Sequence, residues 1–217
     1  SKKIAILLVG ALVLTSAAFP ASAAAKIGEI RLQATKAAVS NSIDAAIDAL
    51  YRLDNGVRTS ALTDGQKSAL KFRVQENITW LEAKKADVHA SSDVAGVLAN
   101  AREANERWNS VYPCLKKEIG FMASDNVDAT IATARSASAV ASGKVSSMNA
   151  RGKDTSAIET ALASYNAHVD SAARRAANAR SEFDSIGTAK PDIHYAAGFR
   201  QLNEAGNELK YAYKDMK

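Results

Sequence analysis

The chain has 217 residues, of which 28 are basic and 23 acidic, and it contains one cysteine, three prolines and 11 glycines. A single cysteine excludes a disulfide within the chain. The small excess of positive charge, two units of which come from Lys2 and Lys3, does not require a nucleic-acid partner.

Residues 1–25 have the three-part layout of a secretory signal peptide. Two lysines precede an uncharged apolar run over residues 4–19, Pro20 breaks the run, and Ala21-Ser22-Ala23 offers small residues for cleavage. A membrane-spanning helix needs about 20 apolar residues, so this run is short for a span. We expect cleavage after residue 23 or 25; an uncleaved anchor and a buried core helix are the alternatives. The rest of the chain is then secreted or extracytoplasmic, in the cell envelope, and would meet a membrane only through an uncleaved leader.

Beyond the leader, apolar residues recur every three or four positions, which predicts helices and not strands. The abundance of alanine also favours helix. The expected helical ranges are 32–57, 70–88, 94–119, 129–153, 158–186 and 195–216. In the last of them the apolar series runs Tyr195, Phe199, Leu202, Gly206, Leu209, Tyr213 and Met216.

Two segments leave alternatives open. The third apolar series passes through Pro113, so we expect a kinked but continuous helix there. The range 129–153 is rich in serine and could be a linker, but its stripe of small residues favours a helix. That helix should be the least stable, because small side chains bury little apolar area.

Local residues predict where the helices begin and end. A glycine can supply the positive φ that terminates a helix, whereas Ser, Thr and Asp side chains accept the first amide hydrogens, and proline suits the first turn. The expected signals are Asn55-Gly56 as an end, Thr63 or Asp64, Ser91-Ser92-Asp93 and Asp154-Thr155 as beginnings, and Pro191 in the last first turn.

Two short segments recur at almost equal offsets. Thr59-Ser60-Ala61-Leu62 returns as Thr155-Ser156-Ala157-Ile158 after 96 residues, and Arg102-Glu103-Ala104-Asn105-Glu106 returns as Arg200-Gln201-Leu202-Asn203-Glu204 after 98. The offsets favour a tandem repeat. We therefore predict an all-α, elongated helical bundle: a signal helix over 1–25, then two coiled-coil-like three-helix units over 26–124 and 125–217. One compact bundle is the alternative.

Residues 30–217 resemble spectrin-type repeats in helix count and repeat length, and in that family three-helix units join end to end through a shared helix. The phrases RGKDTSAIETALASYNAHV and LNEAGNELKYAYKDMK also resemble uncharacterised, Ala-rich, exported helical proteins of prokaryotes. Neither resemblance implies an activity or a cofactor.

The three histidines do not form a metal or catalytic pattern. His89, His168 and His194 each lie two residues from an aspartate, and side chains at i and i+2 point about 200° apart on a helix. Such pairs cannot chelate a metal from a regular helix, so we expect solvent-facing or capping histidines. No Gly-rich phosphate loop is present. We predict no catalytic residue, no metal site and no cofactor.

The lone Cys114 is the one candidate for covalent chemistry. Lys116 and Lys117 lie nearby and could activate its thiol. An intermolecular disulfide through Cys114 would then be expected; the alternative is a half-buried, inert side chain.

Basic residues gather in the second half of the chain, because residues 129–153 contain no acidic side chain. If neighbouring helices pack antiparallel, these residues could form one basic surface toward lipid headgroups or acidic polysaccharide. The alternative is an ordinary solvated helix face. The candidates are Arg135, Lys144, Arg151, Lys153, Arg174, Arg175 and Arg180.

These observations predict a non-enzymatic, exported helical scaffold or interaction protein of the cell envelope. Its partner would be an unidentified protein or a second copy of itself, and no nucleic acid is expected. A binder of an anionic surface is the alternative, and an envelope enzyme or metal carrier is a remote one.

Overall fold

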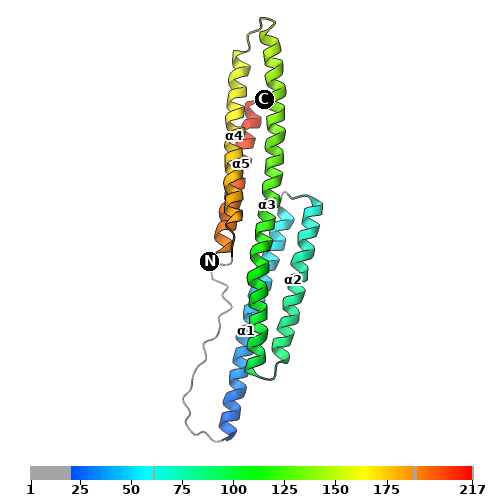
Figure 1. The fold of residues 1–217 in the computed structure, drawn as a ribbon, viewed down its shortest axis with the longest axis vertical. Helices are drawn as coiled ribbons and strands as arrows, with labels where there is room; N and C mark the ends of the chain where they lie inside the picture. The colour runs from blue at the N-terminus through cyan, green and yellow to red at the C-terminus, as the bar shows by residue number, and fades with distance from the viewer. Residues whose placement is uncertain (1–20, 61, 188–189, 217) are drawn as a thin grey trace. The chain divides into compact units, whose positions relative to one another are not determined.

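The computed structural model describes residues 21–60, 62–187 and 190–216, and this part of the chain contains five helices and no strand (Figure 1). The helices are α1 (Ala21–Thr59), α2 (Asp64–Ala90), α3 (Val94–Asn149), α4 (Ser156–Asp184) and α5 (Pro191–Asp215). They pack into a bundle, so the all-α prediction is confirmed. Most of the predicted signal peptide lies outside the described residues. None of the described helices is both long and apolar enough to cross a membrane.

Five helices replace the six predicted ranges, because 94–119 and all but the last four residues of 129–153 belong to one helix. α3 runs for 56 residues and continues through Pro113, as expected. The predicted break after residue 119 is wrong. Gly120 and Ser124 are buried inside the helix, where the Ser124 hydroxyl donates a hydrogen bond of 2.9 Å to the Gly120 carbonyl. The linker interpretation of 129–153 is wrong for the same reason.

The predicted helix ends are mostly confirmed. The Gln66 amide donates to Thr63 Oγ1 at 3.3 Å while Gln66 Oε1 accepts from the Thr63 amide at 3.0 Å, which is a capping box. Asp93 caps α3 by accepting from the Gly96 amide at 2.7 Å. The end predicted at Asn55-Gly56 is wrong: α1 continues to residue 59, and Gly56 does not take a positive φ. Glycine can also adopt the helical conformation, so the presence of Gly56 in the sequence does not by itself mark the end of α1.

The helices form two compact units. The first contains α1, α2 from Lys67 onward and α3 up to Tyr112. Its core is a set of aliphatic side chains from all three helices, with Ile43, Leu70 and Val97 fully buried. At its surface, Lys85 Nζ lies 2.7 Å from both carboxylate oxygens of Asp44 and ties α2 to α1.

The second unit contains α3 from Pro113 onward, α4 and α5, together with residues 60, 62 and 63 of the α1–α2 connection and the first three residues of α2. The sequence placed the boundary at 124/125, whereas the packing of α3 changes from one unit to the other at Pro113. The centre of this unit is built from small residues. Ala172, Ala176 and Ala179 of α4 are fully buried, so neighbouring helices can approach α4 closely.

One aromatic ring fills a space left by two glycines in the second unit. Phe183 of α4 is fully buried, and its ring packs edge-on against Phe199 at 5.3 Å between centroids. A Cβ placed on Gly120 of α3 or Gly198 of α5 would lie 2.4 or 2.3 Å from ring atoms of Phe183. Both positions therefore require glycine for steric reasons.

Candidate interaction surface

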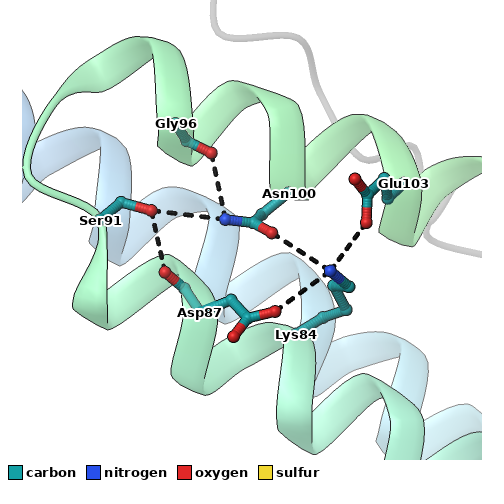
Figure 2. Close-up of polar contacts among 6 residues, drawn as sticks. All are labelled: Lys84, Asp87, Ser91, Gly96, Asn100 and Glu103. Atoms are coloured by element: carbon teal, nitrogen blue, oxygen red, sulfur yellow. Dashed lines mark hydrogen bonds and ion pairs between the residues drawn. The ribbon is translucent and has the colours of Figure 1, made fainter.

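A network of polar side chains connects the end of α2 to the beginning of α3 in the first unit (Figure 2). Lys84 Nζ lies 2.7 Å from Glu103 Oε2, 3.1 Å from Asp87 Oδ2 and 3.4 Å from Asn100 Oδ1. The Asn100 amide in turn donates to Ser91 Oγ at 3.4 Å. The hydrogen bond to Glu103, followed by the one to Asp87, raises the pKa of Lys84. Lys84 is thus a fixed cation that joins the two helices.

Trp80 covers the seam between α2 and α3 in the same unit. The guanidinium carbon of Arg107 lies 4.7 Å from the centre of its indole ring, and Lys84 Nζ lies 5.7 Å from it. Arg107 Nε also donates to Asn77 Oδ1 at 2.9 Å. Beneath this layer a hollow of about 10 Å³ is lined by Leu50, Asn77, Leu81, Arg107, Trp108 and Val111. That volume is about what one water molecule requires, so the hollow cannot hold a substrate.

Each of the three histidines lies within hydrogen-bonding distance of a side chain on a neighbouring helix; His89 is also exposed, as expected, whereas His168 and His194 are half-buried. His89 Nε2 of α2 lies 3.3 Å from Ser40 Oγ of α1 in the first unit. In the second unit, His168 Nδ1 of α4 lies 2.7 Å from Glu208 of α5, and His194 Nδ1 of α5 lies 2.9 Å from Glu182 of α4. The histidines therefore serve helix pairing and do not converge on one another.

A serine, a histidine and an aspartate do meet between α4 and α5, but not in a catalytic order. Ser164 donates its hydroxyl to Asp215 Oδ2 at 2.7 Å, and His168 Nε2 lies 3.8 Å from that same oxygen. A nucleophilic serine needs its hydroxyl on the imidazole, which acts as the base, and not on the carboxylate. Among the described residues, no group of three or more His, Cys, Asp or Glu side chains is arranged to hold a metal ion.

Three of the seven predicted basic residues form ion pairs with carboxylates from other helices of the second unit. Arg135 of α3 lies 3.1 Å from Asp170 of α4, and Arg175 of α4 contacts Glu204 of α5. Arg180 pairs with two aspartates of α3, including Asp128 at 2.9 Å. The hydrogen bond to the other, Asp125, is the largest cause of the raised pKa of Arg180. These arginines hold helices together.

The other four basic candidates have exposed side chains: Lys144, Arg151, Lys153 and Arg174. Arg151 bonds locally, since its guanidinium donates to the Ser147 carbonyl at 3.0 Å and to the Ser147 hydroxyl at 3.1 Å. Three of these residues lie at the turn between α3 and α4 or in the last turns of α3, so positive charge is exposed mainly at that end of the helix pair.

Cys114 is exposed on α3, which leaves its thiol accessible to a partner. The two lysines that could activate it point elsewhere. Lys116 bonds to Asp192, and Lys117 Nζ lies 2.8 Å from Asp184 Oδ1, so both lysines connect α3 to the α4–α5 region of the second unit. The structure does not place either ammonium group on the thiol.

Lys116 is a buried lysine that sequence reasoning missed as a structural residue. Its side chain is 7% exposed, and its ammonium group bonds to Asp192 and lies 4.5 Å from the centre of the Tyr195 ring. Burial lowers the pKa of Lys116, against the opposing effect of Asp192. The signal in the sequence is that position 116 adjoins the apolar stripe through Leu115 and Ile119, whereas Lys116 entered the sequence-based prediction only as a neighbour of Cys114.

Tyr195 should be among the last tyrosines of the protein to ionise. Burial raises the pKa of its phenol to about 12. The unfolded chain loses this proton near pH 10, so the stabilisation by neutral Tyr195 is complete below pH 10 and is lost as the pH rises toward 12. Absorbance at the phenolate band, recorded against pH, should show a late component that Tyr195→Phe removes. An unchanged titration curve in this variant would contradict the burial argument.

No protein-family model matches the chain, and neither the curated proteins nor the solved structures include one that is significantly similar.

Proposed function

We propose that the chain is a non-enzymatic, exported scaffold or interaction protein of the cell envelope, built from two tandem three-helix units. One observation carries this proposal: apart from the exposed Cys114, the side chains best suited to acid–base or nucleophilic chemistry are engaged between helices. Every histidine, together with Ser164 and the buried Lys116, bonds to a residue of a neighbouring helix. Groups that are fixed and satisfied in this way support a stable surface better than a reaction centre.

The tandem arrangement is supported by α3, which contributes a helix to both units. Its residues 94–112 pack in the first unit and its residues 113–149 in the second. A helix shared between consecutive units is the arrangement that the spectrin resemblance implies. Small-angle scattering on residues 26–217 tests it: two units end to end give a maximum dimension roughly twice that of one compact bundle, and a globular profile would contradict the proposal.

The scaffold role predicts specific contacts at exposed apolar side chains. Val140 of α3, Ile193 of α5 and Phe72 of α2 are 62%, 58% and 72% exposed. A photo-crosslinking amino acid placed at each position in the native host should give a discrete adduct, with another protein or with a second copy, from at least one of them. The buried position Leu209 serves as the matched control and should give none. Recovery of the protein in the cytoplasm, or no adduct from any exposed position, would contradict an envelope scaffold.

The second candidate function is binding to an anionic surface, favoured by the four exposed basic residues and by the absence of acidic residues from 129–153. A lysine near an anionic membrane contributes about 1 kcal/mol. Lys144→Glu combined with Lys153→Glu should therefore weaken binding to phosphatidylserine-containing vesicles by about tenfold or more. Added salt should weaken wild-type binding in parallel, because it screens exposed charges.

The control for that experiment carries the same change of charge elsewhere. Lys26 and Lys71 are exposed on α1 and α2 of the first unit. If Lys26→Glu combined with Lys71→Glu weakens binding as much as the test variant, only net charge matters and the α3–α4 region is not the binding surface.

A further inference from the structure

One imidazole lies between two carboxylates at the C-terminal end of α5. His168 Nδ1 is 2.7 Å from Glu208 Oε2, and His168 Nε2 is 3.8 Å from Asp215 Oδ2. Glu208 and Asp215 are seven residues apart, which places them two turns apart on one face of α5. The ring is 33% exposed, so solvent protons reach it while its partners stay close. His168 therefore contacts both of the last two turns of α5.

Protonation changes what this ring can do. A neutral imidazole carries one N–H, and the shorter contact assigns that hydrogen to Nδ1, which donates to Glu208. Nε2 then presents a lone pair to the Asp215 carboxylate, which is repulsive. The imidazolium ion carries N–H groups on both nitrogens, so the same contact becomes attractive. Histidine is the side chain whose charge changes near neutral pH.

From α5, Glu208 and Asp215 are the facing carboxylates, and the Tyr211 ring lies 5.6 Å from the imidazole. The hydrogen bond from His168 is the largest cause that lowers the pKa of Glu208, with smaller effects from Ser171 and Arg175 of α4, so Glu208 remains ionised across the neutral range.

Three more polar groups lie around the imidazole. Arg175 itself contacts Glu204, and Ser164 donates to Asp215. From α3, Arg135 pairs with Asp170, whose side chain points away from His168 on α4. Arg135 and Arg175 are thus each paired with a carboxylate, and Lys214 Nζ lies 5.5 Å from the centre of the Tyr211 ring.

We propose that His168 is a pH-responsive clamp that fixes the C-terminal end of α5 on α4 when protonated and releases its last turn when neutral. Release loosens Asp215 first, because Asp215 then keeps only the hydrogen bond from Ser164, whereas Glu208 keeps its bond with the neutral ring. The last turn also carries Tyr213, whose ring meets the buried Tyr165 edge-on at 6.5 Å. Opening this turn uncovers one end of the core of the second unit. For a protein exposed to an external medium, acidification would hold that end closed.

Hydrogen exchange of the amides in 209–216 tests the clamp directly. Protection factors, corrected for the intrinsic pH dependence of exchange, should be about two- to fivefold higher at pH 5.5 than at pH 8, as expected for a partly exposed ion pair. In His168→Gln the difference should vanish, since glutamine does not titrate. In Asp215→Asn it should shrink strongly, because the second partner has lost its charge.

His194→Gln is the matched control. His194 pairs with Glu182 at 2.9 Å near the beginning of α5, far along the helix from residues 209–216. This variant should keep the wild-type difference in protection. If His168→Gln and Asp215→Asn keep the difference, or if His194→Gln abolishes it equally, the clamp is overturned. If His168→Gln does not fold, the Asp215→Asn result alone decides, because that side chain lies at the end of α5.

Discussion

Gly198→Ala should destabilise the protein, although alanine is the better helix former. The new Cβ would lie 2.3 Å from the nearest ring carbon of Phe183 and under 3.0 Å from two more. Phe183 is fully buried between helices and cannot swing away. Overpacking of this kind costs about 1–3 kcal/mol of stability. Replacing glycine by alanine in a helix gains roughly 1 kcal/mol, so the upper part of the overpacking range exceeds the gain. Far-UV circular dichroism during thermal or urea unfolding measures the loss; both tryptophans lie in the first unit and would not report on this site directly.

Two variants separate the steric effect from the helix-propensity effect. Gly206 lies on the same helix, and a Cβ there would meet no atom within 4 Å, so Gly206→Ala should stabilise by up to about 1 kcal/mol. In the Gly198→Ala background, Phe183→Leu should recover part of the loss, because it removes the atoms in conflict. A Gly198→Ala protein as stable as Gly206→Ala, or a double variant that shows no coupling, would contradict the close packing of Phe183.

The sequence predicted the helices well where one apolar stripe is buried by several neighbours. In α4, where the predicted apolar series starts at Ile158, that first residue is 43% exposed, but the series is buried at every position from Leu162 to Phe183. In α5, Leu202 and Leu209 are buried as predicted, but the other buried positions are shifted by one residue: Gly198, Ala205 and Ala212 are buried, whereas Tyr213 and Met216 are nearly half exposed. The prediction followed the largest apolar residues. The buried alanines of α4 instead select small residues of α5, because only these allow the two backbones to approach.

The spectrin resemblance implied a shared helix, but periodicity could not predict the continuity of α3, because its support is not local. Residues 120–128 lack a strong apolar series, and periodicity alone suggested a break there. In the folded chain, Arg180 bonds to Asp125 and Asp128 across 55 and 52 residues. Contacts between residues so far apart in the sequence depend on which helices become neighbours in the fold. A single sequence does not show this.

The same limit applies to the candidate basic surface. The sequence showed that 129–153 contains no acidic residue, and it suggested a cationic face. The neutralising carboxylates come from other segments: Asp170 is 35 residues from Arg135, and Glu204 is 29 residues from Arg175. A count of charges along one helix therefore overestimates the positive charge that a partner meets.

Tyr165→Ala should be among the most damaging substitutions in the second unit. The side chain is 1% exposed, it packs with Ile131 of α3 and Leu209 of α5 in one core cluster, and its hydroxyl donates to the Ala134 carbonyl at 3.0 Å. Truncating a large buried aromatic side chain costs about 3–5 kcal/mol, because packing is lost and a cavity remains. The surrounding alanines cannot extend into that cavity, so the loss should lie toward the upper end. The free energy of unfolding in urea, followed by circular dichroism, measures it.

Tyr165→Phe divides this loss into a packing part and a polar part. Phenylalanine keeps the ring, so the variant should lose only the hydroxyl hydrogen bond, about 1 kcal/mol. Tyr51→Ala on α1 gives the comparison for a tyrosine that is 46% exposed, and it should change stability by no more than about 0.5 kcal/mol. If Tyr165→Ala were as mild as Tyr51→Ala, α5 would not cover Tyr165. The hydrogen bond to Ala134 would then have to hold α3 and α4 together without α5. We do not expect this, because a pair of helices with mostly alanine contacts buries too little apolar surface to be stable.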